Sequence, residues 1–142
     1  MRLMMCSLLL LCLAETCVAQ VQPALCPRHI ETPFYPLIAL MAHVTGKVIV
    51  AVTIASDGKV SDAKVINHDN FVKLLGANAV ESIRHWTFVR PPTAPYTEAV
   101  TYDYEMPASL KMQETRVSYD LPDLIRILAG PPLLQTSQST KH

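Results

Sequence analysis

The clearest pattern in the chain is a strict alternation of apolar residues between residues 47 and 54. The intervening positions are also largely apolar. A period of two predicts a β-strand, and apolar character on both faces predicts a central place in a sheet. Gly58 then supplies the positive φ of a turn, and residues 59–67 form the return strand. The apolar positions of that strand are out of strict alternation, which predicts a bulge near Ser61-Asp62.

Two helices and a third strand are also predicted. Pro36 suits the first turn of a helix that Gly46 ends. Its apolar residues recur at helical spacing: Leu37, Leu40, Met41 and Val44. Asp69 or Asn70 can cap a second helix. One stripe of that helix carries Leu75, Ala79, Ile83 and Trp86. Several prolines then exclude helix, and alternation predicts a strand over residues 98–106.

The order helix, strand, strand, helix, strand predicts an α+β domain over residues 35–106. The simplest compact layout is a three-stranded sheet of order 2-1-3, with both helices on one face. The third strand then lies at an edge, where its N–H and C=O groups are unpaired. A C-terminal extension over residues 107–132 is predicted to hold a short strand at 114–119 and a helix at 121–129. Residues 133–142 read as a polar tail.

The first residues indicate export. Arg2 is followed by an apolar stretch at residues 3–14, and small residues lead to Ala19. This arrangement is typical of a secretory signal peptide at residues 1–19, cut after Ala19, followed by an extended lead-in at 20–34. The alternative is an uncleaved membrane anchor, although the apolar run is shorter than the roughly 20 residues of a spanning helix. After cleavage Cys26 is the only cysteine. Cys26 therefore remains as a thiol or bridges two chains.

Composition and motifs exclude several classes of function. Twelve Lys and Arg balance 12 Asp and Glu, so the net charge is zero and no basic block favours nucleic acid. The histidines are scattered without metal-ligand spacing, and no nucleotide-binding or nucleophile-elbow motif occurs. Asp57 and Asp69 are explained by turn and capping roles. We therefore predict no enzymatic activity, no metal and no cofactor.

A set of short motifs in fixed order resembles the TonB C-terminal domain family. The residues that carry the resemblance are Tyr35-Pro36, Ala39, Gly46-Lys47-Val48-Ile49-Val50, Asp57-Gly58-Lys59-Val60, Ala79, Trp86-Thr87-Phe88 and Pro91. The resemblance implies an αββαβ layout and a periplasmic binding module without cofactors or catalytic residues. It further implies that an extended segment of an outer-membrane receptor adds as a strand beside the last strand of the domain.

Two sets of residues are singled out: a partner-binding edge that the resemblance implies, and a core that the apolar pattern predicts. The partner-binding edge is expected at Val100, Thr101, Tyr102, Asp103 and Tyr104, where unpaired backbone groups would accept an added strand. The core is expected to contain Tyr35, Ala39, Val48, Val50, Val52, Ile54, Leu75, Ala79, Ile83, Trp86 and Phe88. The predicted function is a non-enzymatic periplasmic or secreted protein-binding domain linked to envelope transport, with self-association into a homodimer as a further mode. The alternative is a structural accessory domain whose C-terminal segment covers its own sheet edge.

Overall fold

The structure is a computed structural model that describes residues 26–133. The predicted signal peptide and all of the predicted tail beyond Leu133 lie outside this range. The elements within it are β1 (Pro27–His29), α1 (Leu37–Met41), β2 (Gly46–Ile54), β3 (Val60–Val65), α2 (Val72–Arg84), β4 (Thr87–Phe88), β5 (Tyr96–Glu105), β6 (Thr115–Asp120) and β7 (Leu124–Ala129).

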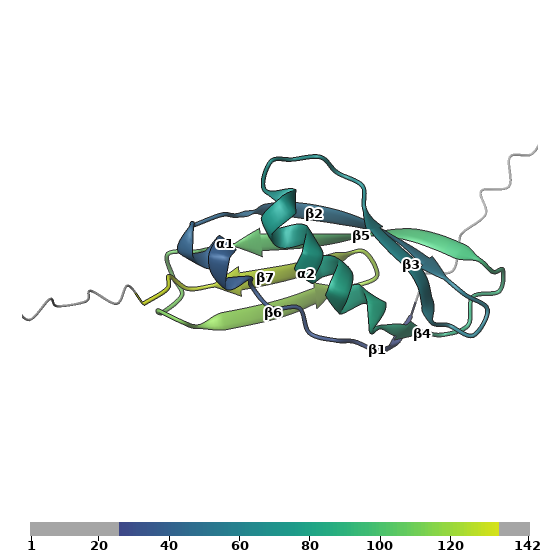
Figure 1. Cartoon of the computed structure of the whole chain (residues 1–142). Coiled ribbons are helices and arrows are strands. Elements are labelled where there is room, and N and C mark those ends of the chain that lie inside the picture. The colour runs from purple at the N-terminus through teal and green to yellow at the C-terminus, as the bar shows by residue number, and fades with distance from the viewer. Residues whose placement is uncertain (1–25, 134–142) are drawn as a thin grey trace, which may run out of the picture.

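A five-stranded sheet of order β3-β2-β5-β7-β6 forms one layer, and α1 and α2 lie together on one of its faces (Figure 1). β2 pairs antiparallel with β3 and with β5, while β7 pairs parallel with β5 and antiparallel with β6. The α+β class is thus confirmed. β3, β2 and β5 follow the order predicted for the first three strands, but the sheet contains five strands rather than three.

The C-terminal extension corrects two predictions. The segment predicted as a helix at 121–129 contains the strand β7, and β5 is consequently an interior strand rather than an edge. In β7 the side chains of Ile125, Ile127 and Ala129 are buried, whereas those of the intervening residues are more exposed. This alternation lets β7 bury one row of side chains while its backbone bonds to strands on both sides. The strand predicted at 114–119 corresponds to β6, displaced by one residue.

The end of α1 and the start of α2 differ from the sequence prediction. α1 spans only five residues, and of these only Ala39 is buried. The sequence predicts that Gly46 takes the left-handed position beyond the helix, but His43 takes it, at a φ of 51°, and Gly46 instead begins β2. Phe71 rather than Asp69 or Asn70 is the N-cap of α2, and no side chain caps that helix end.

The core lies between the helical layer and the sheet. Every residue predicted for the core is buried, including Trp86 with 1% of its surface exposed. The indole N–H of Trp86 donates to the backbone oxygen of Glu31 over 3.0 Å, which fixes the lead-in segment against α2. The C-terminal extension adds Ile125, Ile127 and Ala129 to the same core. The extension is therefore an integral part of the folded domain.

A small two-stranded sheet joins the lead-in to the chain after α2. β1 pairs antiparallel with β4, and an isolated bridge connects Lys59 with Thr87. The register of β3 against β2 shifts between Thr53 and Ile54, leaving Ser61 as the extra residue, so the bulge predicted near Ser61-Asp62 is confirmed. Gly58, at a φ of +86°, holds the turn next to the carbonyl of Phe88.

Candidate protein-interaction surfaces

The residues predicted to form the binding edge lie in the interior of the sheet. Val100, Tyr102 and Tyr104 face the helical layer and are buried in the core. On the opposite face, Asp103 pairs with Lys47, whose ammonium lies 3.5 Å from its carboxylate. The backbone N–H of Thr101 donates to the carbonyl of Asp123 over 2.6 Å. The expectation that β5 offers unpaired backbone groups is therefore wrong, because β7 already occupies that position.

The terminal strand on this side of the sheet is β6. Its six residues pair with β7 in unbroken register, and the N–H of Gly130 donates to the carbonyl of Glu114 just before the strand. Backbone groups in an antiparallel pair point alternately toward and away from the partner strand. Counting from Glu114, the N–H and C=O groups of Thr115, Val117 and Tyr119 point away from β7. Within residues 26–133, no strand pairs with this outer side of β6.

The opposite edge, at β3, is less regular. The bulge at Ser61 interrupts its register with β2, and the turn that precedes it is tied to β4 by a bond from the N–H of Phe88 to the carbonyl of Gly58, 2.8 Å long. A bulge and a covering segment are two means by which proteins protect an edge strand from pairing. β6 has no bulge and, within residues 26–133, no strand pairs with its outer side, so it is the better template for an additional strand.

The side chains of β6 are held firmly. The Tyr119 ring lies 6.2 Å from the Trp86 ring, and its hydroxyl donates to the Thr32 hydroxyl over 3.3 Å. The guanidinium of Arg116 donates twice to the Glu114 carboxylate, over 2.8 and 2.6 Å. These bonds, together with one from the backbone N–H of Lys111, lower the pKa of Glu114 below its usual value. Contacts within the domain thus hold the side chains of this strand in place.

Three buried tyrosines with raised pKa values belong to the core rather than to a reactive centre. Burial raises the pKa of Tyr35 to about 12 and raises the pKa values of Tyr102 and Tyr104 further. The Tyr35 hydroxyl donates to the carbonyl of Val44 over 2.5 Å, and its ring packs edge-to-face on Tyr104 at 5.3 Å. These phenols remain neutral and serve packing. Among the described residues, no three His, Cys, Asp or Glu side chains converge on a metal-sized site.

Cys26 is exposed next to β1, and its backbone oxygen accepts a bond from the N–H of Val89 over 2.8 Å. No helix within residues 26–133 combines the length and the hydrophobicity that crossing a membrane requires.

Comparison with known proteins places the chain in a family. A sequence model described as the C-terminal domain of the Gram-negative bacterial TonB protein matches residues 31–119, more than half of the chain. No curated protein sequence gives a match. The solution NMR structure of the Pseudomonas aeruginosa TonB CTD aligns with a TM-score of 0.43 and 22% identity, covering 58% of this chain and 84% of that one. On the strength of the family match, the chain belongs to the TonB C-terminal domain family.

Proposed function

We propose that the protein is a non-catalytic, periplasmic protein-interaction domain linked to envelope transport, and that it binds an extended segment of a partner protein by strand addition at β6. Membership of the TonB C-terminal family supports an interaction domain of the envelope. The observation that carries the finer proposal is the position of β6 at the end of the sheet, with one row of backbone groups directed outward. An outer-membrane receptor is the class of partner that the family suggests.

Strand addition at β6 has a definite geometry. The outward N–H and C=O groups of Thr115, Val117 and Tyr119 would form the ladder with the added strand. Side chains of that strand would alternate between the helical side, beside Val117 and Tyr119, and the opposite face, beside Arg116 and Ser118. We therefore expect a partner segment in which apolar and polar residues alternate.

Strand addition at β5 would require β7 to leave. Ile125 and Ile127 are fully buried, and exposing each side chain would cost roughly 1.5–3 kcal/mol. The two together amount to roughly 3–6 kcal/mol, before the lost backbone bonds are counted. A partner peptide would have to recover this free energy before it gained any affinity. Binding at β6 carries no such cost.

A second candidate is the structural accessory domain, in which the C-terminal segment completes the sheet and no peptide is bound. The pairing of β7 with β5, with its bond from Thr101 to Asp123, favours this candidate. The two functions differ in one consequence. Strand addition requires the outer backbone groups of β6 to remain accessible, whereas the accessory function does not.

The test uses Val117→Pro in a pull-down from an envelope extract of Gram-negative cells. Proline removes an N–H that points outward, so the ladder with β7 is retained while an added strand loses a bond. Val117→Ala is the matched control because it shortens the same side chain and keeps the N–H. We expect the wild-type protein and Val117→Ala to retain the same envelope proteins and Val117→Pro to lose them. Circular dichroism checks that both variants are folded.

Two outcomes would contradict the proposal. If Val117→Pro retains the same proteins, the partner binds somewhere other than the β6 edge. If the wild-type protein retains none, the accessory function is favoured.

A further inference from the structure

A groove runs between α2 and the segment that leads into α1. Its wider part has a volume of about 410 Å³ and is lined by Phe34, Pro36, Leu74, Ala77, Asn78 and Glu81. An adjoining part of about 230 Å³ is lined by Glu31, Thr32, Pro33, Phe34, Asn78, Glu81, Ser82 and His85. The two parts share Phe34, Asn78 and Glu81, so they form one continuous hollow along α2, which we call the α1–α2 groove.

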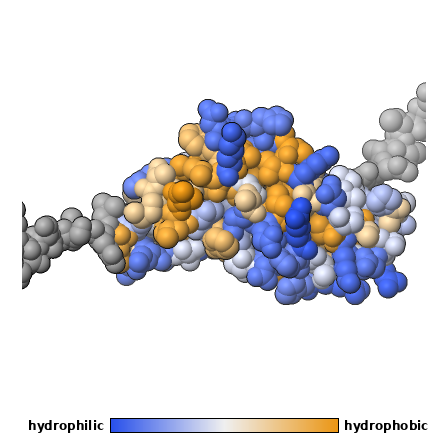
Figure 2. Space-filling view, viewed as in Figure 1, coloured by the Kyte–Doolittle hydropathy of each residue, from blue (hydrophilic) through white to orange (hydrophobic). Residues whose placement is uncertain are grey.

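The walls of the groove continue into an exposed apolar surface. Phe34 is 64% exposed, and on α1 the side chains of Leu37 and Ile38 are 70% and 66% exposed. α1 contains no charged residue. Figure 2 shows hydrophobic side chains gathered over α1 and the adjoining part of α2. Single exposed apolar side chains are ordinary, but a contiguous group beside a hollow is typical of an interaction site.

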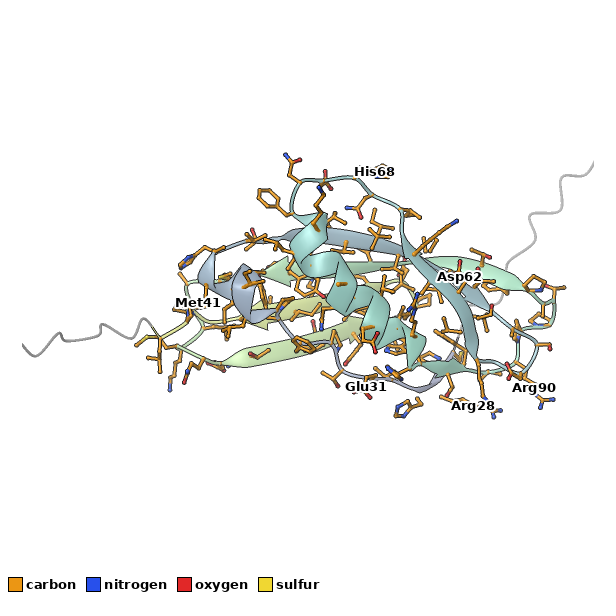
Figure 3. The ribbon with its side chains drawn as sticks, in the orientation of Figure 1. Arg28, Glu31, Met41, Asp62, His68 and Arg90 are labelled. Carbon is orange, nitrogen blue, oxygen red and sulfur yellow. The ribbon has the colours of Figure 1, made fainter. Side chains whose placement is uncertain are left out.

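Two acidic side chains line the groove. Its lining includes the carboxylates of Glu31 and Glu81 and contains no lysine or arginine. Both carboxylates are accessible: the side chain of Glu81 is 66% exposed and that of Glu31 is 56% exposed. Each lies beside a histidine, because the Nε2 atoms of His85 and His29 are 3.0 and 3.9 Å from the nearest oxygens of Glu81 and Glu31. In Figure 3, Glu31 lies on the lead-in beside α2, while Met41 marks the apolar end at α1.

We propose that the α1–α2 groove docks a segment of a partner protein that presents apolar side chains followed by a lysine or arginine. The apolar residues would lie against Phe34, Leu74 and Ala77, and the cation would lie between Glu31 and Glu81. Leu74 and Glu81 are seven residues apart on the helix, which corresponds to about 10 Å along its axis. An extended partner chain covers that distance in about three residues. The segment therefore needs two or three apolar residues next to one basic residue.

Charge argues for this occupant over a second copy of the same chain. A groove facing a copy of itself would bring the carboxylates of Glu31 and Glu81 close to their own equivalents, and like charges across an interface oppose association. A basic side chain instead gains from both carboxylates. The groove is lined by the lead-in and α2 rather than by β6, which touches it through the bond from Tyr119 to Thr32, and docking there does not depend on strand addition.

The experiment selects from a phage-displayed library of random linear peptides on the immobilised 142-residue protein. Affinities of the selected peptides are then measured by fluorescence anisotropy for wild-type and variant proteins. Glu81→Lys reverses the charge inside the groove. Asp62→Lys is the matched control because it makes the same reversal at an exposed position on β3, away from the groove (Figure 3). Phe34→Ser tests the apolar wall.

We expect selected peptides to combine apolar residues with lysine or arginine. Their affinity should fall at least about tenfold with Glu81→Lys and with Phe34→Ser, and remain unchanged with Asp62→Lys. Val117→Pro should leave it unchanged as well, which separates this groove from the β6 edge. The proposal is overturned if no peptide is selected, if selected peptides lack basic residues, or if Asp62→Lys weakens binding as much as Glu81→Lys. Loss of binding with Val117→Pro, or a protein dimer that Phe34→Ser dissociates, would overturn it too.

Discussion

Replacing single residues of β7 tests whether the C-terminal segment is a strand of the central sheet. Ile127 is fully buried on the helical face, whereas Leu128 is half-buried on the opposite face. Ile127→Ala removes a core side chain and leaves a cavity, so it should cost about 2–5 kcal/mol in the free energy of unfolding. Leu128→Ala removes a side chain that is only half withdrawn from water, and about 1 kcal/mol is expected. A chain of this size loses about 4 °C in melting temperature per kcal/mol. The melting temperature should therefore fall by about 8–20 °C for Ile127→Ala and by about 4 °C for Leu128→Ala.

The comparison is informative because a helix would give the opposite ranking. In a helix over residues 121–129, Leu124 and Leu128 are four residues apart and share one face, so Leu128 would lie at the centre of the buried stripe. Far-UV circular dichroism monitors the thermal unfolding and the urea unfolding of both variants. These two experiments measure the difference in stability between them. If Leu128→Ala lowers the free energy of unfolding as much as Ile127→Ala or more, residues 124–129 do not form a strand. In that case the edge of β5 is not covered.

Three further perturbations test the core, a turn and the tyrosines. Trp86→Ala should lower the free energy of unfolding by about 3–5 kcal/mol, measured by urea denaturation, because the ring is buried; an unchanged midpoint would remove it from the core. Gly58→Ala should destabilise far more than Gly46→Ala, since an added Cβ would lie 2.3 Å from the Phe88 oxygen at Gly58 and within 4 Å of nothing at Gly46. Both glycines have positive φ, so backbone strain alone would predict similar losses. Burial raises the pKa of Tyr35 from 10.0 to about 12. The neutral phenol therefore contributes fully to the free energy of unfolding below pH 10, and this contribution declines as the pH rises toward 12. The difference in phenolate absorbance between the wild-type protein and Tyr35→Phe should therefore rise together with loss of structure, and titration of Tyr35 with the fold intact would contradict this.

The sequence was most informative where a pattern was long. The alternation that predicts β2 extends over the full strand and gives both of its faces, and the stripe along α2 spans several turns. The bulge at Ser61 followed from a break in alternation that no straight strand explains. Along β2 and α2, the positions that the pattern places in the core are buried in the structure.

The short segments were harder to assign. Six residues from Leu124 to Ala129 are compatible with a strand and with a helix, because a period cannot be resolved over so few positions. The aspartates before the segment and Gly130 after it resemble helix-capping residues. Gly130 instead packs against a turn, where an added Cβ would lie 1.8 Å from the carbonyl oxygen of Lys111. The deciding influence was the edge of β5, a tertiary partner that local sequence does not record.

The path of the chain explains why the exposed edge lies at β6. After β5 the chain passes over one strand position, forms β6 at the margin, and returns as β7 into the gap. β7 runs parallel to β5 and antiparallel to β6, so it is the strand that joins β6 to the sheet. Without β7, β6 would have no neighbour and β5 would be an edge. The family match ends at residue 119, before β7 begins. The six residues of β7 therefore decide which backbone groups lie at this end of the sheet, because they close the edge at β5 and place another at β6.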